Sequence, residues 1–394
     1  GFGGIEGDDG MMTLVKDYAE QIRGVSYKPE DVCEELNDES ITLLRANNIT
    51  DSGLCFDDLV YVRRNKVKDV QKLQKGDVLI CTSSGSKALV GKAAYVTKDM
   101  DMTFGAFCKV IRPHGVNTDY FQYFFQSPAY RKKISELAAG ANINNIRNEH
   151  IDGLAFYLPD ISTQQRIADT LDKVSEGIGL CRKMLGELDL MVKAKFVEMF
   201  GDAKVNPFDW VQSTIGASCA LKSGTSLPIE KENECGNIPY VKVGDMNYVG
   251  NEKYITTSSR FVTEETAGVG IFPVGSVVFP KRGGAIGTNK KRLTSVPICA
   301  DLNVMGVIPG KQLLPQYLLA YFDTIDLGLL NNGSSVPQIN NKDIAPLIIS
   351  IPPIELQEQF ATFVSKIDKS RLTIQQVLSK MEMVKLALMQ EYFG

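Results

Sequence analysis

The chain has 394 residues, of which 44% are hydrophobic and 23% are charged, proportions typical of globular proteins with well-filled cores. Its length favours two or three domains, and no apolar run approaches the ~20 residues that a membrane helix needs. We therefore expect a cytoplasmic protein that does not bind membranes. The net charge of −4, taken alone, argues mildly against nucleic acid as a partner.

The N-terminal segment and the cysteines argue against secretion. Residues 1–10 (GFGGIEGDDG) are glycine-rich and acidic, and they lack the basic and apolar regions of a signal peptide. We expect them to be a cloning remnant outside the fold. The eight cysteines are scattered, and none forms a C-x-x-C pair. This pattern favours reduced, buried thiols over a disulfide framework.

Two segments, residues 11–145 and 202–338, show short β-rich runs that alternate with turns. The runs fall at 41–44, 78–81 and 106–111 in the first segment and at 238–243, 277–279 and 304–308 in the second. Each segment then has an aromatic helical stretch, at 120–125 and at 317–322. The patterns predict two globular domains of mixed α/β class.

Residues 146–201 and 339–394 predict one helix of about 40 residues each, because their apolar positions alternate steps of four and three. Pro159 and Pro352 precede the helices, and Gly201 and Gly394 follow them, as start and stop residues should. We expect the apolar seams of the two helices to pair as a coiled coil. The seam residues are Ile167, Leu171, Val174, Ile178, Leu185, Leu188 and Val192 in the first helix and Phe360, Val364, Ile367, Ile374, Leu378, Met381 and Leu388 in the second. The alternative is that each helix packs only on its own domain.

These two helical segments are copies of one another. At an offset of 193 they align without a gap from Ile146 and Ile339 to Gly201 and Gly394. The residues LPDISTQQRIADTLDKV at 158–174 correspond to IPPIELQEQFATFVSKI at 351–367. The domains that precede them resemble each other more loosely. The chain therefore reads as a tandem repeat, and we expect pseudo-two-fold symmetry with antiparallel helices.

The sequence shows no motif that would supply catalysis. Its two histidines, His114 and His150, do not combine with the isolated cysteines at any metal-binding spacing, and no H-E-x-x-H occurs. The glycines of KRGGAIGTNKK (281–291) do not match G-x-G-x-x-G. Neither NPFD (206–209) nor IPPI (351–354) matches the motif of amino-methyltransferases. We expect no catalytic residues, no metal site and no cofactor bound by this chain.

Basic charge is concentrated in two loops that follow a strand at equivalent places in both halves, TSSGSKALVGK (82–92) and PKRGGAIGTNKKR (280–292). Glycine lets a backbone approach a ligand closely, and Lys and Arg bind phosphates or guanine edges. The alternative is that these are merely solvated loops. The candidate DNA-binding residues are Lys281, Arg282, Gly283, Gly284, Lys290, Lys291, Arg292, Lys242 and Asn247 in the second half, and Ser84, Ser86, Lys87, Lys92, Arg63 and Arg64 in the first.

The arrangement resembles the specificity subunit of Type I restriction-modification enzymes. The resemblance covers residues 12–394 and is carried by IPYVKVGDMN (238–247), VGSVVFPKRGGAIG (274–287), GSSVPQINNKDI (333–344) and IPPIELQEQFATFVSKID (351–368). It implies two target-recognition domains that read the two parts of a bipartite, asymmetric site in double-stranded DNA. It also implies that the antiparallel helices separate these domains and dock methyltransferase subunits, of which we expect two, together with restriction endonuclease subunits.

The resemblance implies further that this chain is not an enzyme. S-adenosylmethionine, ATP and Mg would belong to the partner subunits of the DNA methylation complex. Two other interpretations of the sequence stay open. One is a DNA-binding nuclease or methyltransferase with an unrecognised active site, and the other is a helical scaffold that binds only protein.

Overall fold

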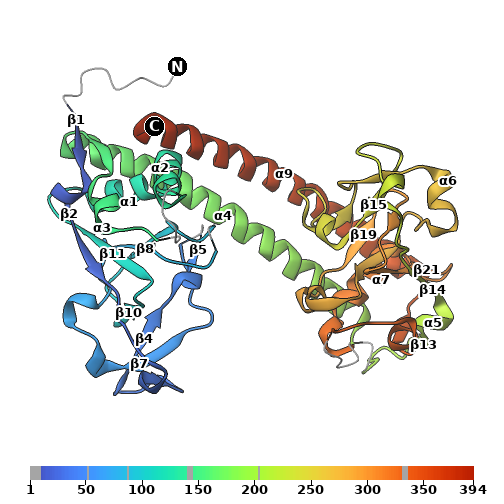
Figure 1. Cartoon of the computed structure of the whole chain (residues 1–394). Coiled ribbons are helices and arrows are strands. Elements are labelled where there is room, and N and C mark those ends of the chain that lie inside the picture. The colour runs from blue at the N-terminus through green and yellow to red at the C-terminus, as the bar shows by residue number, and fades with distance from the viewer. Residues whose placement is uncertain (1–9, 51–52, 87, 140–144, 203–204, 331–335) are drawn as a thin grey trace. The chain divides into compact units, whose positions relative to one another are not determined.

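The computed structural model describes residues 10–50, 53–86, 88–139, 145–202, 205–330 and 336–394 (Figure 1). They form two compact units, each of which holds one mixed domain and half of each long helix. The first unit runs to Cys181 and includes Val377–Gly394, and the second is Arg182–Gln376. The division thus falls inside both helices, whereas the repeat pattern alone places boundaries at 145, 201 and 338.

The first unit is built on two four-stranded sheets. One has the order β2-β11-β8-β9, is antiparallel, and consists of β2 (Ala19–Arg23), β11 (Cys108–Pro113), β8 (Val78–Cys81) and β9 (Ala93–Tyr95). The other has the order β10-β4-β7-β3 and consists of β10 (Met102–Phe104), β4 (Ser40–Leu44), β7 (Val60–Arg63) and β3 (Val32–Cys33). In this sheet β10 runs parallel to β4.

In the described part of the first unit there are also two strand pairs and three short α-helices. The pairs are β1 (Met11–Leu14) with β12 (Ala155–Leu158) and β5 (Ile49–Thr50) with β6 (Gly53–Leu54). The helices are α1 (Thr118–Gln126), α2 (Pro128–Ala139) and α3 (Asn148–Asp152). The aromatic face of α1 is buried, and Phe121 and Phe124 pack on Phe156 of β12. This cluster joins the sheets to the long helices.

The second unit repeats the plan with a five-stranded and a three-stranded sheet. The larger has the order β14-β21-β18-β19-β16, from β14 (Cys219–Ser223), β21 (Val304–Pro309), β18 (Val277–Pro280), β19 (Arg292–Thr294) and β16 (Tyr254–Ile255). The smaller has the order β17-β15-β20, from β17 (Phe261–Val262), β15 (Ile238–Val241) and β20 (Cys299–Ala300). A separate pair joins β13 (Val211–Thr214) to β22 (Ile348–Ile351), and the short helices are α5 (Ile215–Ser218), α6 (Glu264–Ala267), α7 (Pro315–Asp323) and α8 (Asn341–Ile344).

The strand orders show that the loosely similar domains share one topology. The series β2-β11-β8-β9 corresponds to β14-β21-β18-β19, and β10-β4-β7 corresponds to β20-β15-β17. In the sheets β10-β4-β7-β3 and β17-β15-β20 one edge strand, β10 or β20, runs parallel to its neighbour. The tandem repeat therefore extends from the helices to the domains.

The long helices α4 (Ile161–Phe200) and α9 (Ile354–Phe393) begin and end at residues equivalent in the repeat. Asp160 caps α4, because its carboxylate accepts hydrogen bonds from the backbone N–H groups of Ser162 (2.8 Å) and Thr163 (3.1 Å). The side-chain hydroxyls of Ser162, which donates at 2.5 Å, and Thr163 are the main reason why the pKa of Asp160 lies below its usual range, and the backbone bonds add to their effect. Gly201 follows α4 at a φ of 71°, a left-handed conformation that favours glycine.

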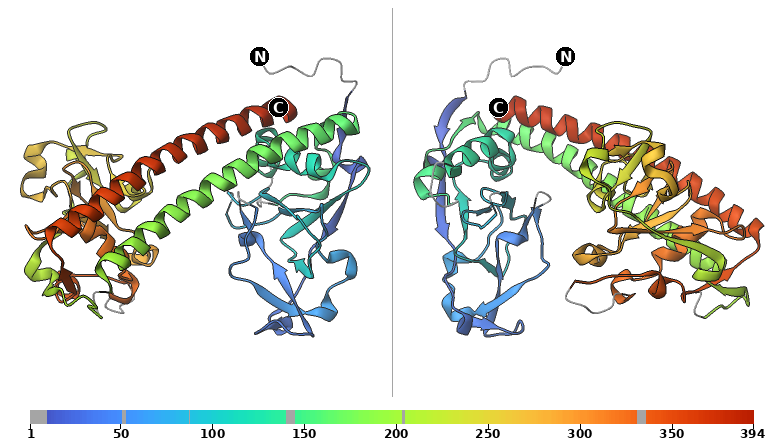
Figure 2. Two further views of the ribbon diagram at one scale, coloured as in Figure 1. Left: turned by 180° about the vertical axis from the view of Figure 1, so that it is seen from behind. Right: turned by 45° about the vertical axis from the view of Figure 1, so that its right-hand side comes forward.

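In each unit, one half of α4 lies against the opposite half of α9 (Figure 1, Figure 2). In the first unit the start of α4 packs with Leu388 and Phe393 near the end of α9. In the second unit Phe360 lies near the start of α9. The centroid of its ring is 5.7 Å from that of Phe196 and 5.5 Å from that of Phe200, both at the end of α4. The helices are therefore antiparallel.

The predicted fold class, mixed α/β domains with two long antiparallel helices, is confirmed. All fourteen predicted seam residues are buried or half-buried. Two strands stop short of a predicted end. The strand expected at 106–111 begins at Cys108 because residues 105–107 form a turn, and the strand expected at 238–243 ends at Val241 because Val243–Asn247 forms a 3-10 turn.

Candidate nucleic-acid interface

The two loops singled out in the sequence occupy equivalent positions. After β18, the Lys281 N–H donates to the Asn303 carbonyl (2.8 Å), and the Lys281 carbonyl accepts from the Ile339 N–H (2.9 Å). After β8, the Thr82 N–H donates to the Phe107 carbonyl (2.9 Å), and the Thr82 carbonyl accepts from the Ile146 N–H (2.8 Å). An isolated β-bridge follows in each loop, Arg282 with Gln338 and Ser83 with Asn145. Each loop is thus anchored to the start of the repeated segment.

Three of the five cations in the second loop are turned inward. Lys281 is buried, and its Nζ donates to Ser223 Oγ at 2.9 Å. The Nζ of buried Lys291 donates to the Ile325 carbonyl (2.6 Å), and burial lowers the pKa of this ammonium group to about 8. The Arg292 guanidinium donates to the carbonyls of residues 251, 291 and 246 at 2.7, 2.9 and 3.3 Å. These three side chains hold the loop in place.

Arg282 and Lys290 present the charge of this loop at its surface. The Arg282 side chain is exposed and makes no hydrogen bond or ion pair within the described residues. Gly283 follows at a φ of 68°, which a residue with a Cβ rarely adopts, and a Cβ added at Gly284 would meet open space. The Nζ of Lys290 donates to the side-chain oxygen of the exposed Asn247.

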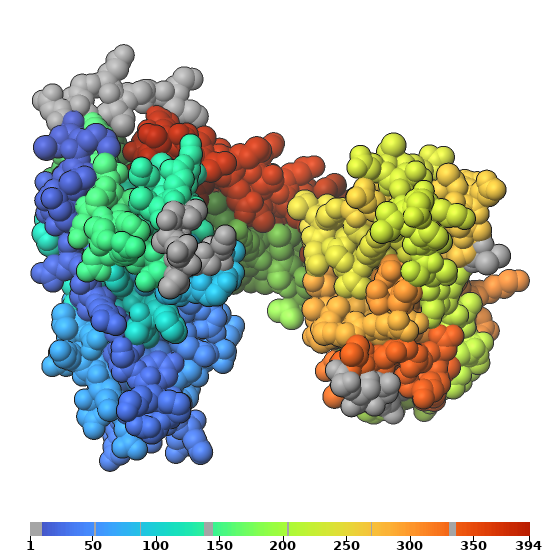
Figure 3. Space-filling model, viewed as in Figure 1, coloured from blue at the N-terminus to red at the C-terminus, as the bar shows by residue number. Residues whose placement is uncertain are grey.

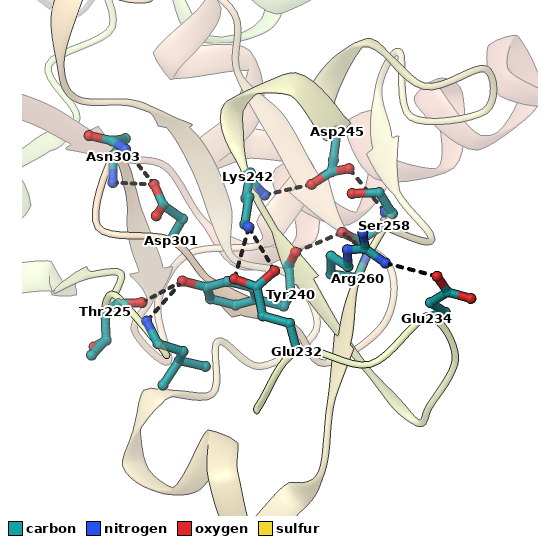
Figure 4. A network of polar contacts seen from close by, with 12 residues as sticks. Thr225, Glu232, Glu234, Tyr240, Lys242, Asp245, Ser258, Arg260, Asp301 and Asn303 are labelled. Carbon is teal, nitrogen blue, oxygen red and sulfur yellow. Dashed lines mark hydrogen bonds and ion pairs between the residues drawn. The ribbon is translucent and has the colours of Figure 1, made fainter. Parts of the chain in front are cut away.

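Lys242 belongs to a polar network on the β15 side of the same unit (Figure 4). Its Nζ forms an ion pair with both carboxylate oxygens of Glu232 (2.8 Å each) and lies 5.4 Å from the centroid of the Tyr240 ring. The carboxylate of Asp245 accepts from the Lys242 N–H at 2.7 Å, and the Tyr240 hydroxyl donates to the Thr225 carbonyl at 2.9 Å. The charge of Lys242 is therefore compensated by its own domain.

The candidate residues of the first domain are dispersed. Arg64 forms a bidentate ion pair with Asp101 (2.9 Å twice), which lowers the pKa of that carboxyl, and also donates to the Ser40 carbonyl. Arg63 and Ser86 are exposed, whereas Ser84 and Lys92 are half-buried. Lys87 lies outside the described residues. The described candidate residues of this domain therefore do not form a single cationic surface.

A cleft of about 680 Å³ does exist in the first unit, and sequence reasoning missed it. Its walls come from β2, the loop after β8, the turn before β11 and the segment that leads into α3. None of the candidate residues predicted for this domain lines it; the polar and aromatic side chains that do include Arg23, Ser83, Phe107, Lys109, Asn145 and Arg147. The available signal was the 193-residue offset, which places Asn145 and Arg147 opposite Gln338 and Asn340.

The described cysteines and histidines do not form a metal centre. In the described part of the chain no group of three or more His, Cys, Asp or Glu side chains could hold a metal ion. All eight cysteines are free, and burial raises the pKa of the Cys81 thiol to about 11. Contrary to the expectation that all are buried, Cys235 is exposed, and Cys33, Cys55 and Cys219 are half-buried. Among the described helices, none has the length and apolarity to cross a membrane.

Comparison with solved structures relates the fold to known proteins. The S subunit of a Type I restriction-modification system from M. genitalium has a TM-score of 0.55 at 14% identity, and the alignment covers 99% of this chain and 97% of that one. A chain from a study of complex assembly and conformational transition of the type I R-M system gives the same TM-score and identity, over 97% of both chains. At such identities the likeness concerns the fold alone.

Sequence comparison identifies the family. The EcoKI specificity subunit of Escherichia coli (strain K12) is 28% identical over 377 residues, covering 88% of this chain and 79% of that relative. The StySPI specificity subunit of Salmonella potsdam is 39% identical over 173 residues, which is 44% of this chain and 37% of the relative. The model of the Type I restriction modification DNA specificity domain matches twice, over residues 25–189 and 207–382. The chain therefore belongs to the family of Type I restriction modification DNA specificity domains.

Proposed function

We propose that this chain is the DNA-recognition subunit of a Type I restriction-modification complex and that each domain reads one part of a bipartite site. The observation that carries the proposal is the duplication itself. Two domains of one topology present equivalent loops, anchored by the same backbone bonds, that carry unlike side chains. An equivalent frame with different chemistry suits the recognition of two different half-sites.

The test combines genetics with binding. Methylome sequencing of a host with and without this gene identifies the methylated site. The assembled complex should then bind a duplex with that site and lose affinity as salt rises, because cations on the protein replace counterions on the DNA. A complex that methylates no defined site, or binds all duplexes equally, would contradict the proposal. Binding of proteins but never of DNA would identify a scaffold instead.

The partner proposal is that two methyltransferase subunits dock on α4 and α9, with restriction endonuclease subunits in the same complex. Apolar side chains that reach the surface at equivalent places on the two helices support it. The pairs are Met184 with Val377, Leu190 with Met383 and Met191 with Val384, and all six residues are between 40% and 64% exposed. In the space-filling view the red, C-terminal part of α9 is visible at the surface (Figure 3). Such repeated exposed apolar positions are typical of interaction faces.

Native mass spectrometry of the complex tests this stoichiometry. We expect Leu190→Glu to remove one methyltransferase, Met383→Glu to remove the other, and the double variant to remove both, because a buried charge disfavours each interface. Glu187→Ala, a change at an exposed charged position on α4, serves as the control for general damage to the helix. Loss of both subunits in either single variant would contradict two independent docking faces.

We also propose that the chemistry belongs to the partners, which would bind S-adenosylmethionine, ATP and Mg. The support is membership in a family of recognition domains, together with a duplicated architecture devoted to two binding loops. Purified chain supplied with S-adenosylmethionine and magnesium should neither methylate nor cleave DNA that contains the site. Turnover by the chain alone that disappears on mutation of one of its carboxylates would overturn this assignment.

A further inference from the structure

The cleft of the first unit has a fixed floor. The Gln21 side chain donates to the Asn148 carbonyl (2.9 Å) and to Asp152 Oδ1 (2.7 Å), which ties β2 to α3. The Lys109 Nζ donates to Gln21 Oε1 at 3.2 Å and to the side-chain oxygen of Asn148. The three elements that form the floor, β2, β11 and α3, are thus cross-linked before any ligand arrives. A cleft fixed in this way can orient the side chains on its rim at low entropic cost.

The rim carries exposed side chains that the domain does not use. Phe107 is 69% exposed, and Arg23 and Asn145 are exposed as well. The Arg23 side chain makes no hydrogen bond or ion pair with the described residues. Within the described residues, the Arg147 side chain pairs only with that of Glu149, at 3.5 Å, and both side chains are more than half exposed. Arginines, an amide and an aromatic ring around one cleft are the residue types that contact base edges and thymine methyl groups.

The second unit shows that these rim positions are free to vary. Backbone bonds fix the correspondence, because the Phe107 and Asn303 carbonyls each accept from the first residue after the central strand. The β-bridges likewise match Ser83 with Arg282 and Asn145 with Gln338. In the strand ladders, Arg23 pairs with Lys109 and Ser223 pairs with Met305. Lys109 and Met305 each lie two residues after the matched carbonyls, so Arg23 corresponds to Ser223. Arg23, Ser83 and Phe107 therefore have unlike counterparts.

Residues that hold the fold behave differently. The Tyr120 hydroxyl donates to the Tyr157 carbonyl and the Tyr317 hydroxyl to the Ser350 carbonyl, at 2.5 and 2.7 Å. Structural contacts are thus repeated in both units, whereas the chemistry of the rim is not. Unlike side chains on a shared backbone frame are what separate half-sites require.

We infer that Arg23, Phe107, Asn145 and Arg147 determine the base specificity of the half-site read by the first domain. The inference rests on the proposed function and adds the surface through which the first domain reads duplex DNA. Arg23 and Arg147 suit guanine edges, Asn145 suits an adenine edge, and Phe107 suits a thymine methyl group. The loop residues 84–92 would then contact the DNA backbone or stabilise the protein fold.

The experiment is a selection of DNA duplexes, randomised at both half-sites, by the assembled complex. Arg23→Ala, Phe107→Ala and Asn145→Ala are compared with the wild type. Each should relax preference at one or two base pairs of one half-site, with discrimination reduced roughly tenfold to a hundredfold, while the other half-site stays unchanged. Phe56→Ala and Lys98→Ala change exposed residues of the same domain outside the cleft and should leave both half-sites unchanged.

Two results would overturn the inference and leave the proposed function intact. One is an unchanged preference in all three cleft variants, each shown by its melting curve to be folded, while Arg282→Ala relaxes the other half-site. The other is an equal loss of affinity for all sequences, together with a fall of about one in the slope of log affinity against log salt concentration. That result marks a phosphate contact. A wild-type complex that selects no sequence would instead refute the proposed function.

Discussion

Gln164 and Gln357, at equivalent positions of the repeat, make the same pair of hydrogen bonds. The Gln164 side chain accepts from the Asn117 N–H (2.9 Å) and donates to the Pro159 carbonyl (2.7 Å). The Gln357 side chain accepts from the Leu314 N–H (2.8 Å) and donates to the Pro352 carbonyl (2.9 Å). Each glutamine therefore ties the first turn of a long helix to the start of the aromatic helix of its domain, α1 or α7.

Replacement of Gln357 by Ala should destabilise the second unit. Gln357 is fully buried, so the change leaves the Leu314 N–H and the Pro352 carbonyl without their partner. We expect the free energy of unfolding to fall by roughly 2 to 4 kcal/mol in urea titrations. Gln359→Ala, at an exposed position two residues away, is the matched control. Equal stabilities of the two variants would contradict the role of the buried amide.

Arg282 and Arg292, in one basic loop, should respond to mutation in opposite ways. Arg282→Ala should weaken DNA binding by the complex without a change in melting temperature, because its side chain is exposed. Arg292→Ala should lower the free energy of unfolding by about 2 kcal/mol, because it leaves three carbonyls without a donor. Calorimetry and salt-dependent binding measure the two effects. A destabilised Arg282→Ala with normal affinity would reverse the assignment.

Lys291 should make stability depend on pH in the alkaline range. Burial lowers the pKa of its ammonium group from 10.5 to about 8. Between these values the unfolded chain binds more protons at Lys291 than the folded chain, so the free energy of unfolding rises with pH. Relative to Lys291→Met, the wild type should gain about 1 to 3 kcal/mol between pH 7.5 and pH 10. A difference between the two proteins that stays constant over this range would contradict the prediction.

Two glycines of α4 should differ in their response to alanine. At Gly186 an added Cβ meets no atom within 4 Å, so Gly186→Ala should stabilise the helix by about 0.5 to 1 kcal/mol through helix propensity. At Gly177 the Cβ would lie 2.3 Å from Cε of Met381, which must move. Gly177→Ala should therefore stabilise less or destabilise. Thermal unfolding decides, and a larger gain at Gly177 would show that the contact with α9 yields easily.

The helix pair should set the spacer between the half-sites. Arg371 pairs with Asp189 at 2.5 Å, which places the α9 segment near Thr373 beside the α4 segment near Gly186. Inserting four residues, about one turn, at both places should keep the seam in phase and lengthen the helices by ~6 Å. We expect the same half-sites in the methylome with one or two more undefined base pairs between them. An active, well-folded variant with the original spacer would contradict this role, and insertion of two residues, which rotates the seam, should disrupt assembly.

The sequence specifies the long helices well because the repeat keeps its phase there. Prolines precede the starts at Ile161 and Ile354, glycines follow the ends at Phe200 and Phe393, and one gapless offset relates the two helices. Strands such as β8 and β18 were also predictable, since each is a short buried run between turns. The sequence did not reveal that the domain boundary divides both helices, because that depends on antiparallel packing.

The candidate site was harder to predict for two physical reasons. The sequence of a glycine-rich loop does not show whether a lysine side chain faces water or, like that of Lys281, donates to a half-buried hydroxyl, because the flexible side chain permits both. The cleft of the first unit draws on Arg23, Ser83, Phe107 and Asn145, which only the strand order β2-β11-β8 and the Ser83–Asn145 bridge bring together. No local pattern contains that information.

The paired glutamines have a consequence for how such a protein can change. Because Asn117 and Leu314 present the same N–H group to the same amide, either domain meets its helix through an interchangeable joint. A domain transplanted from one position to the other would find its anchoring bonds already in place. Genetic exchange within the duplicated helices could therefore reassort recognition modules without loss of the framework that carries them.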